Sequence, residues 1–235
     1  MAPISEHVAP KRIDAATART IAVMSASVLV IGIAYGVAGH SIGLQWWHLA
    51  VIAALVLAGS SEFVFVGVLA AGGAPVLGAA AGLLINTRNL GYGLSIGPLI
   101  GRGPAAIAGA HLINDETVAL TTAQTEPDRA RRTFYACGIW LALCWPLGAA
   151  LGALLGSVVA DPNELGLDAA MPALLVALAI PALRNRSNAT SALIGVVAAV
   201  LSTPFVPAGL PILIALVGLL GALPRRAWSS RRAAQ

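Results

Sequence analysis

The stretch from Thr20 to Ser61, TIAVMSASVLVIGIAYGVAGHSIGLQWWHLAVIAALVLAGSS, contains no Asp, Glu, Lys or Arg. Residues 63–87, 133–160 and 187–224 also lack these four residue types. A helix needs about 20 mainly apolar residues to cross the roughly 30 Å hydrocarbon core of a bilayer, so each stretch is long enough for one or two crossings. The polarity does not alternate as it would in a membrane β-barrel. The sequence therefore predicts an all-α, polytopic transmembrane helix bundle.

The composition agrees with this class. Of the 235 residues, 58% are hydrophobic and only 10% are charged, whereas soluble domains carry about a quarter charged residues. Residues 1–18 are predicted to form a polar tail rather than a cleaved signal peptide, residues 19–222 the transmembrane domain, and residues 223–235 a basic tail. Such a tail is too short for a nucleic-acid-binding surface. No metal site or cofactor motif is predicted, and Cys137 and Cys144 are interpreted as small hydrophobic residues.

Hydropathy predicts about eight spans, with seven as the alternative. They are expected at residues 19–39, 48–72, 75–100, 103–126, 134–160, 169–183, 189–203 and 205–222. With the N-terminus in the cytoplasm, twelve of the fourteen basic residues fall on the cytoplasmic side, as the positive-inside rule requires. The loop with Asp161, Glu164 and Asp168 then lies outside. The prediction is a multi-pass protein of the cytoplasmic membrane with both termini in the cytoplasm.

Four ionisable residues interrupt the predicted apolar zone: Glu62, Arg88, Asp115 and Glu116. Each costs roughly 2.5–3.5 kcal/mol on insertion scales if it faces lipid. We therefore expect these side chains to gather around a shared, wet cavity. One interpretation is a substrate or ion pathway, which is the usual role of intramembrane charge, and the other is an ion-pair network that only holds helices together.

Two of these charges follow residues that disturb helices. Glu62 comes after Gly59, Ser60 and Ser61, and Arg88 comes after Asn86 and Thr87. Because Gly weakens a helix and Ser or Asn can cap one, we predict broken half-helices near residues 59–62 and 86–89. Half-helix N-termini carry partial positive charge and free N–H groups, and broken helices of this type are typical of transporter substrate sites.

The predicted span 103–126 is interpreted as one helix with a polar stripe of His111, Asn114, Asp115 and Thr122. Glu116 lies about 100° around the helix from Asp115, so the two carboxylates are expected to serve different partners. One of them is expected to pair with Arg88.

Pairs of small residues four apart predict close helix packing elsewhere. They are Gly32 with Gly36 and Gly148 with Gly152.

The motifs Gly59-Ser-Ser-Glu-Phe63, Asn86-Thr-Arg88, Gly91-Tyr-Gly-Leu-Ser95 and Asp115-Glu116 resemble those of the AzlC-type branched-chain amino acid permeases, in order and in spacing. The chain differs from the common family pattern in Glu62, where many members carry Gln, and in Asn89, where His is common. The resemblance implies export of amino acids such as valine, leucine or isoleucine. It also implies a small AzlD-type membrane subunit as the partner.

An amino acid is a zwitterion, so its site needs a positive group, a negative group and an apolar pocket. The sequence predicts a secondary transporter with proton-coupled alternating access. The predicted substrate-binding residues are Ser60, Ser61, Glu62, Phe63, Asn86, Arg88, Tyr92, Asp115 and Glu116. The predicted proton-coupling residues are Glu62, His111 and Asp115. A channel, a structural subunit of a membrane complex and, less in keeping with the motifs, an intramembrane enzyme using Ser60 or Ser61 remain alternatives.

Overall fold

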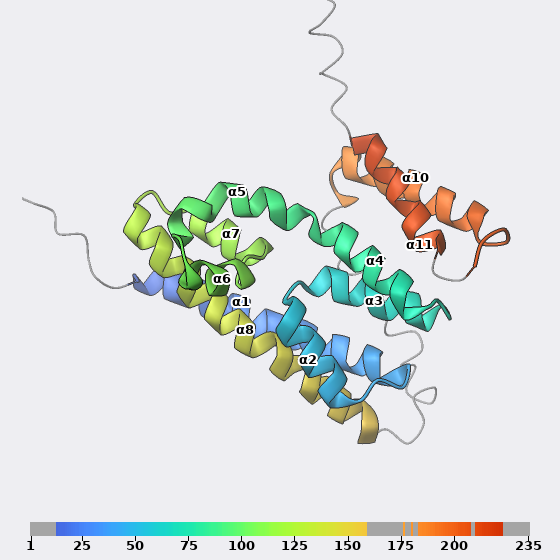
Figure 1. Cartoon of the computed structure of the whole chain (residues 1–235), viewed down its shortest axis with the longest axis horizontal. Coiled ribbons are helices and arrows are strands. Elements are labelled where there is room, and N and C mark those ends of the chain that lie inside the picture. The colour runs from blue at the N-terminus through green and yellow to red at the C-terminus, as the bar shows by residue number, and fades with distance from the viewer. Residues whose placement is uncertain (1–12, 159–175, 177–179, 181–182, 208–209, 223–235) are drawn as a thin grey trace, which may run out of the picture. The chain divides into compact units, whose positions relative to one another are not determined.

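A computed structural model describes residues 13–158, 176, 180, 183–207 and 210–222. All regular structure in these residues is helical. The elements are α1 (Ala15–Ser41), α2 (Trp46–Val56), α3 (Gly59–Ala70), α4 (Pro75–Asn86), α5 (Arg88–Ile100), α6 (Pro104–His111), α7 (Asp115–Thr122), α8 (Pro127–Val158), α10 (Arg186–Ser202), α11 (Leu210–Ile214) and the 3-10 helix η1 (Ala215–Ala222). Figure 1 shows these elements in chain order. The all-α class is confirmed.

Two helices in the described residues, α1 and α8, are long and apolar enough to cross a membrane unaided. The other predicted spans consist of shorter helices. The predicted breaks near residues 59–62 and 86–89 are confirmed to within two residues, because α2 ends before Leu57 and α4 is separated from α5 by Thr87. The predicted span 169–183, the acidic loop at 161–168 and most of both predicted tails lie outside the described residues.

The chain divides into two compact units. The first contains the described residues of Met1–Gly36, Trp46–Gly59 and Asn86–Leu154, and the second contains those of Val37–Gln45, Ser60–Ile85 and Leu155–Gln235. The chain passes between units at Gly59 and at Asn86, which lie at the two predicted helix breaks. The sequence signals for broken helices therefore also mark boundaries between units.

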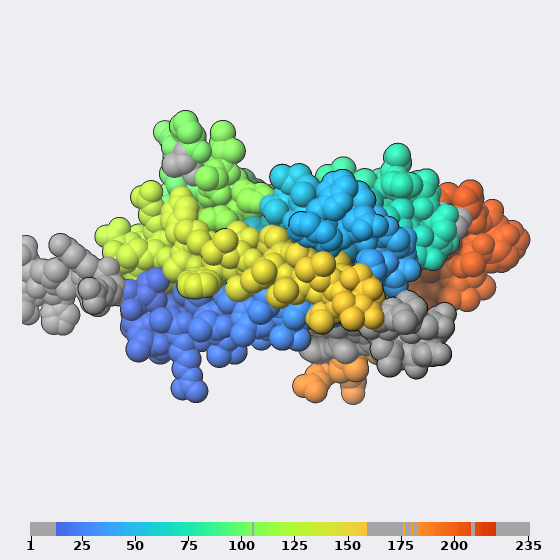
Figure 2. Space-filling model, turned by 90° about the horizontal axis from the view of Figure 1, so that it is seen from below, coloured from blue at the N-terminus to red at the C-terminus, as the bar shows by residue number. Residues whose placement is uncertain are grey.

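In the first unit, α1 and α8 pack side by side (Figure 1; Figure 2). A Cβ atom on Gly148 would lie 2.5 Å from the backbone oxygen of Leu29, and one on Gly152 would lie 1.9 Å from that of Ile33. A Cβ atom on Gly36 would lie 2.2 Å from the backbone oxygen of Ala149. The predicted close packing of the glycine pairs is thus confirmed. Small residues allow such contact between helix backbones.

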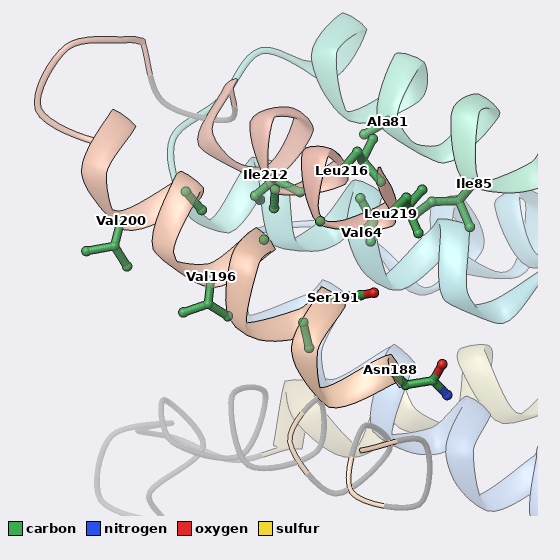
Figure 3. A pocket seen from close by; sticks show the side chains of 15 residues that line it. Val64, Ala81, Ile85, Asn188, Ser191, Val196, Val200, Ile212, Leu216 and Leu219 are labelled. Atoms are coloured by element: carbon green, nitrogen blue, oxygen red, sulfur yellow. The ribbon is translucent and has the colours of Figure 1, made fainter. Parts of the chain in front are cut away.

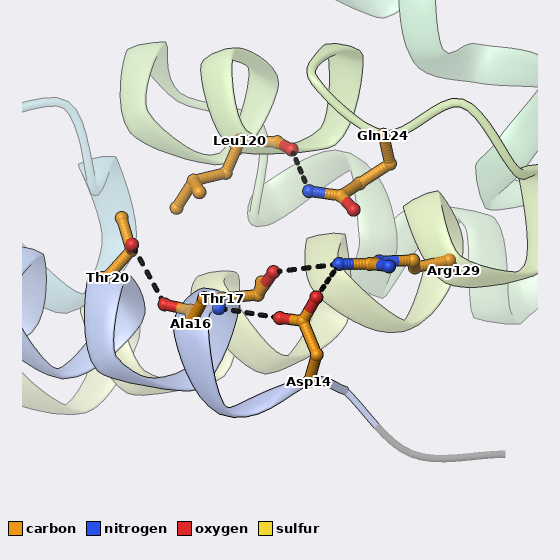
Figure 4. A network of polar contacts seen from close by, with 7 residues as sticks. All are labelled: Asp14, Ala16, Thr17, Thr20, Leu120, Gln124 and Arg129. Atoms are coloured by element: carbon orange, nitrogen blue, oxygen red, sulfur yellow. Dashed lines mark hydrogen bonds and ion pairs between the residues drawn. The ribbon is translucent and has the colours of Figure 1, made fainter. Parts of the chain in front are cut away.

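These contacts also make the two helices parallel, because later residues of α1 meet later residues of α8. Polar contacts lie where both helices begin (Figure 4): Arg129 pairs with Asp14, and its Nη2 donates a hydrogen bond of 3.3 Å to the hydroxyl of Thr17. Parallel membrane helices enter from the same side. The basic residues near the starts of α1 and α8 therefore share a side, as the predicted parity of spans requires.

Apolar contacts attach the short helices to this pair. Ile96 and Ile100 of α5 form a buried cluster with Val118 of α7 and Phe134 of α8. On another face of α7, Leu120 packs against a cluster that joins α1 to α8. α5 and α7 therefore belong to one packed unit.

Candidate functional site

The centre of the first unit contains a helix break that we did not predict. α6 ends at His111, and α7 begins at Asp115. Asn114 between them is extended (φ −149°, ψ 177°), and its side-chain oxygen accepts a hydrogen bond of 2.9 Å from the backbone N–H of Thr117. The hydroxyl of Thr117 in turn accepts a hydrogen bond from the N–H of Asn114, which completes a capping box.

The interpretation of residues 103–126 as one continuous helix is therefore wrong, and so is the polar stripe from His111 to Thr122. The helix is interrupted because the backbone of Asn114 is extended, and the side chain of Asn114 caps the helix that follows. The signal was present in the sequence: an N-cap residue, two acidic residues in the next turn and a hydroxyl residue three positions after the cap.

This break gives the two carboxylates a different setting from the predicted one. Asp115 and Glu116 occupy the first turn of α7, where the helix dipole favours negative charge. At the start of α5, Thr87 keeps helical dihedral angles and its side chain makes no capping hydrogen bond. In the first unit, the well-formed N-cap next to charged residues is Asn114.

Three predicted site residues meet where α5 and α7 begin. Nη1 of Arg88 lies 2.8 Å from Oδ2 of Asp115, and the hydroxyl of Tyr92 donates a hydrogen bond of 2.5 Å to Oδ1 of the same carboxylate. Arg88 and Tyr92 are four residues apart and so share a face of α5. The side chains of Arg88 and Asp115 are partly exposed, with exposed fractions of 33% and 41%.

Asp115 is thus the carboxylate that pairs with Arg88. Glu116, by contrast, shares a face of α7 with Leu120, which packs against Ile21 of α1 and Cys137 of α8. The two neighbouring carboxylates thus lie in different surroundings, and different partners for them stay a prediction.

Two unpaired acceptors flank Arg88. The side-chain oxygens of Asn86 and Asn89 are buried, and neither has a hydrogen-bond partner in the part of the chain that the structure describes. Buried polar atoms without partners are costly, so they need an explanation such as a bound group. In the sequence, Asn89 differs from the others only as a departure from the family pattern. Its unpaired oxygen and its position next to Arg88 in the chain make it a further candidate for substrate binding.

His111 has a structural contact in the same unit. Its Nε2 lies 2.8 Å from the backbone oxygen of Ala54, in the last turn of α2. The last carbonyl groups of a helix lack partners within the helix, and a carbonyl only accepts, so we assign the hydrogen to Nε2. His111 therefore links the ends of α6 and α2, next to the break at Leu57.

That break is supported by two aromatic residues that the sequence reading missed. The rings of Tyr35 and Trp145 are stacked at 5.4 Å, and both side chains are buried. A Cβ atom on Gly59 would lie 3.4 Å from the Trp145 ring. Leu57, just before, has a positive φ of 49°, which is strained for a residue with a branched side chain. The stacked rings therefore lie next to Gly59, the first residue of α3.

The remaining predicted residues lie in the first turns of α3, in the second unit. Ser61, Glu62 and Phe63 are almost fully buried, whereas Ser60 is exposed. Arg88, Tyr92, Asp115 and Glu116 belong to the first unit. The structure therefore brings together Arg88, Tyr92 and Asp115, and a chamber shared with Glu62 stays a prediction. No group of His, Cys, Asp or Glu suited to a metal ion occurs among the described residues.

Comparisons with known proteins agree with the motifs. Residues 23–159 match the family model for AzlC protein. The chain is 29% identical to the branched-chain amino acid transport protein AzlC of Bacillus subtilis (strain 168), over 84% of this chain and 79% of that protein. It is 32% identical to an uncharacterized membrane protein of Haemophilus influenzae, over 72% of this chain and 71% of that one. No solved structure matches.

Proposed function

The chain belongs to the AzlC protein family, and on that premise we propose that it is a secondary transporter for branched-chain or other small apolar amino acids. It works in the cytoplasmic membrane, with both termini in the cytoplasm, as an exporter. The relative from Bacillus subtilis is named as a branched-chain amino acid transport protein, which supports this substrate class. The observation that carries the proposal is the accessible ion pair between Arg88 and Asp115.

This pair offers a zwitterion the two charges that it needs. The carboxylate of the substrate replaces Asp115 at Arg88, and the ammonium group replaces Arg88 at Asp115. The ion pair between Arg88 and Asp115 is replaced by two ion pairs with the substrate. Because the zwitterion has no net charge, the net charge of the site does not change when the substrate enters. Removing a single partner would leave an unpaired charge, which is far more costly than exchanging partners.

The neighbouring groups complete the site. Tyr92 holds Asp115 in position through its hydroxyl, and the unpaired oxygens of Asn86 and Asn89 are acceptors for further N–H donors of the ammonium group. Ser60, Ser61, Glu62 and Phe63 at the start of α3 contribute to the same pathway, with Phe63 in the apolar part of the pocket. Glu116 adds negative charge beside Asp115.

Proton coupling is part of the proposal, because acidic and His residues inside a membrane often form proton relays. Asp115, whose partner changes during the cycle, is one proton carrier. Glu62 and His111 are the other proton carriers in the proposal. His111 contacts the carbonyl of Ala54, so it lies next to the end of α2.

The proposal includes a partner, a small AzlD-type membrane subunit. Co-expression with a small AzlD-type protein from the same organism and purification through a tag on that protein alone test this partner. Recovery of the chain supports the complex, and its absence from the eluate contradicts it.

Counterflow of labelled valine into proteoliposomes tests the site. We expect Arg88→Ala and Asp115→Asn to lower the initial rate at least tenfold, while Arg102→Ala, a change to an exposed arginine outside the site, keeps it. Unlabelled valine should compete, whereas isobutylamine and 3-methylbutanoate, which carry only one of the two charges, should not. Native rates in both site variants would refute the assignment, and competition by either analogue would refute zwitterion recognition.

A further inference from the structure

The second unit contains an apolar groove (Figure 3). Its volume is about 630 Å³. One wall consists of Val64 of α3 with Ala81 and Ile85 of α4, and the other consists of α10 with α11 and η1. None of the candidate transport residues lines it.

The polarity of the groove is uneven along its length. Its only polar lining side chains among the described residues are Asn188 and Ser191, both in the first two turns of α10. In Figure 3 they lie at one end, and Val196 and Val200 follow along the helix. The hydroxyl of Ser191 is buried and has no hydrogen-bond partner in the described residues. The groove thus has one polar end and a long apolar remainder.

The length of the groove corresponds to one leaflet of a bilayer. Its lining on α10 extends from Asn188 to Val200, which is about 18 Å at 1.5 Å per residue. Half of the hydrocarbon core measures about 15 Å. The groove is therefore about as long as one leaflet is deep.

Positive charge is concentrated at the polar end. Arg184 and Arg186 flank Asn185, the N-cap of α10, and both are exposed. Neither forms an ion pair with any residue that the structure describes, and residues 169–235 contain no Asp or Glu at all. The N-terminus of α10 adds its own partial positive charge. This arrangement is complementary to an anionic headgroup, because juxtamembrane arginines attract anionic lipids.

We propose that this groove binds one acyl chain of an anionic phospholipid, with the phosphate held by Arg184 and Arg186. The chain packs between α10 and the α3–α4 hairpin, and the hydroxyl of Ser191 bonds to an ester oxygen near the headgroup. The lipid would then join α10 to the hairpin that begins with Ser61 and Glu62. This site is independent of the amino-acid site, so the failure of one proposal leaves the other standing.

Native mass spectrometry of the purified full-length protein tests the proposal, with phosphatidylglycerol and phosphatidylcholine of identical acyl chains added in turn. We expect one tightly held phosphatidylglycerol and weaker retention of phosphatidylcholine. The double variant Arg184→Gln with Arg186→Gln should bind phosphatidylglycerol about thirty-fold more weakly, since each arginine near the surface contributes on the order of a factor of five. Arg102→Gln is the matched control and should bind as the native protein does.

A second pair of variants tests the groove itself. Ala199→Phe places a ring inside the groove, and Val197→Phe places the same ring on α10 but outside the lining. The proposal is supported if Ala199→Phe loses both lipids, Val197→Phe keeps them, and both variants have the melting temperature of the native protein. Equal retention of the two lipids by the native protein would overturn it. Native binding in both the arginine and the Ala199 variants would also overturn it.

Discussion

Arg88 opens α5, Asp115 opens α7, and their charged groups lie 2.8 Å apart. One ion pair therefore joins the first turns of two short helices that are distant in sequence. Both side chains remain partly exposed, which leaves room for the exchange of partners proposed above.

The hydroxyl of Tyr92 should matter for transport, because it positions Asp115. Tyr92→Phe removes the hydrogen bond to Asp115, and hydrogen bonds to charged groups contribute about 1.5–3 kcal/mol. We expect valine counterflow to fall about tenfold or more. Tyr135→Phe is the matched control, because its hydroxyl contacts only the backbone oxygen of Ile100, at 3.4 Å. Equal rates in the two variants would contradict a positioning role for Tyr92.

The cap at Asn114 should contribute both to stability and to the position of Asp115. Asn114→Ala removes the acceptor for the N–H of Thr117, and the loss of an N-cap costs about 1 kcal/mol. We expect a lower free energy of unfolding, slower transport, and recovery of both with Asn114→Ser. Asn185→Ala provides the comparison, since it removes the cap of α10 instead. If Asn185→Ala slowed transport as much as Asn114→Ala, the effect would be general destabilisation.

The contact between α1 and α8 should not tolerate a side chain at Gly152. The Cβ atom of Gly152→Ala would lie 1.9 Å from the backbone oxygen of Ile33, so the two helices must separate. Overpacking of this kind costs about 1–3 kcal/mol or more, and we expect a lower melting temperature in detergent. Gly67→Ala meets nothing within 4 Å and should leave the melting temperature unchanged or slightly raised. A native melting temperature for Gly152→Ala would show that the helices are not in close contact.

The start of α1 should make stability sensitive to acid. Hydrogen bonds from the hydroxyl and the backbone N–H of Thr17, together with Arg129 nearby, lower the pKa of Asp14 below its usual 3.8. A carboxyl group whose pKa is lower in the folded state stabilises the fold above its unfolded pKa, and the contribution is lost as the pH falls through the folded pKa. We therefore expect part of the stability to disappear below about pH 3.8.

Melting temperatures of the native protein and of Asp14→Asn between pH 6 and pH 3 provide the measurement. Asn also caps helices well, so this variant keeps the cap but cannot titrate. Its melting temperature should fall less steeply with acid than that of the native protein. Parallel curves would show that Asp14 has no share in the acid response.

The sequence by itself determined the class of the protein and much of its layout. Long uncharged runs predict helices in a membrane, because lipid offers no hydrogen bonds to the backbone and a helix satisfies its own. Residues such as Gly59 and Asn86 also located two helix breaks to within two residues, since helix propensity and capping are local properties. The capping box at Asn114 is also a local property, but the apolar residues on both sides of it favour one continuous span.

The tertiary structure decided which residues meet. Helical periodicity shows that Asp115 and Glu116 point in different directions, yet only the packing of α5 against α7 selects Asp115 as the partner of Arg88. The parallel contact of α1 with α8 and the support of Gly59 by Trp145 likewise depend on residues far apart in the chain. Such pairings arise from distances through space, which a single sequence does not encode position by position.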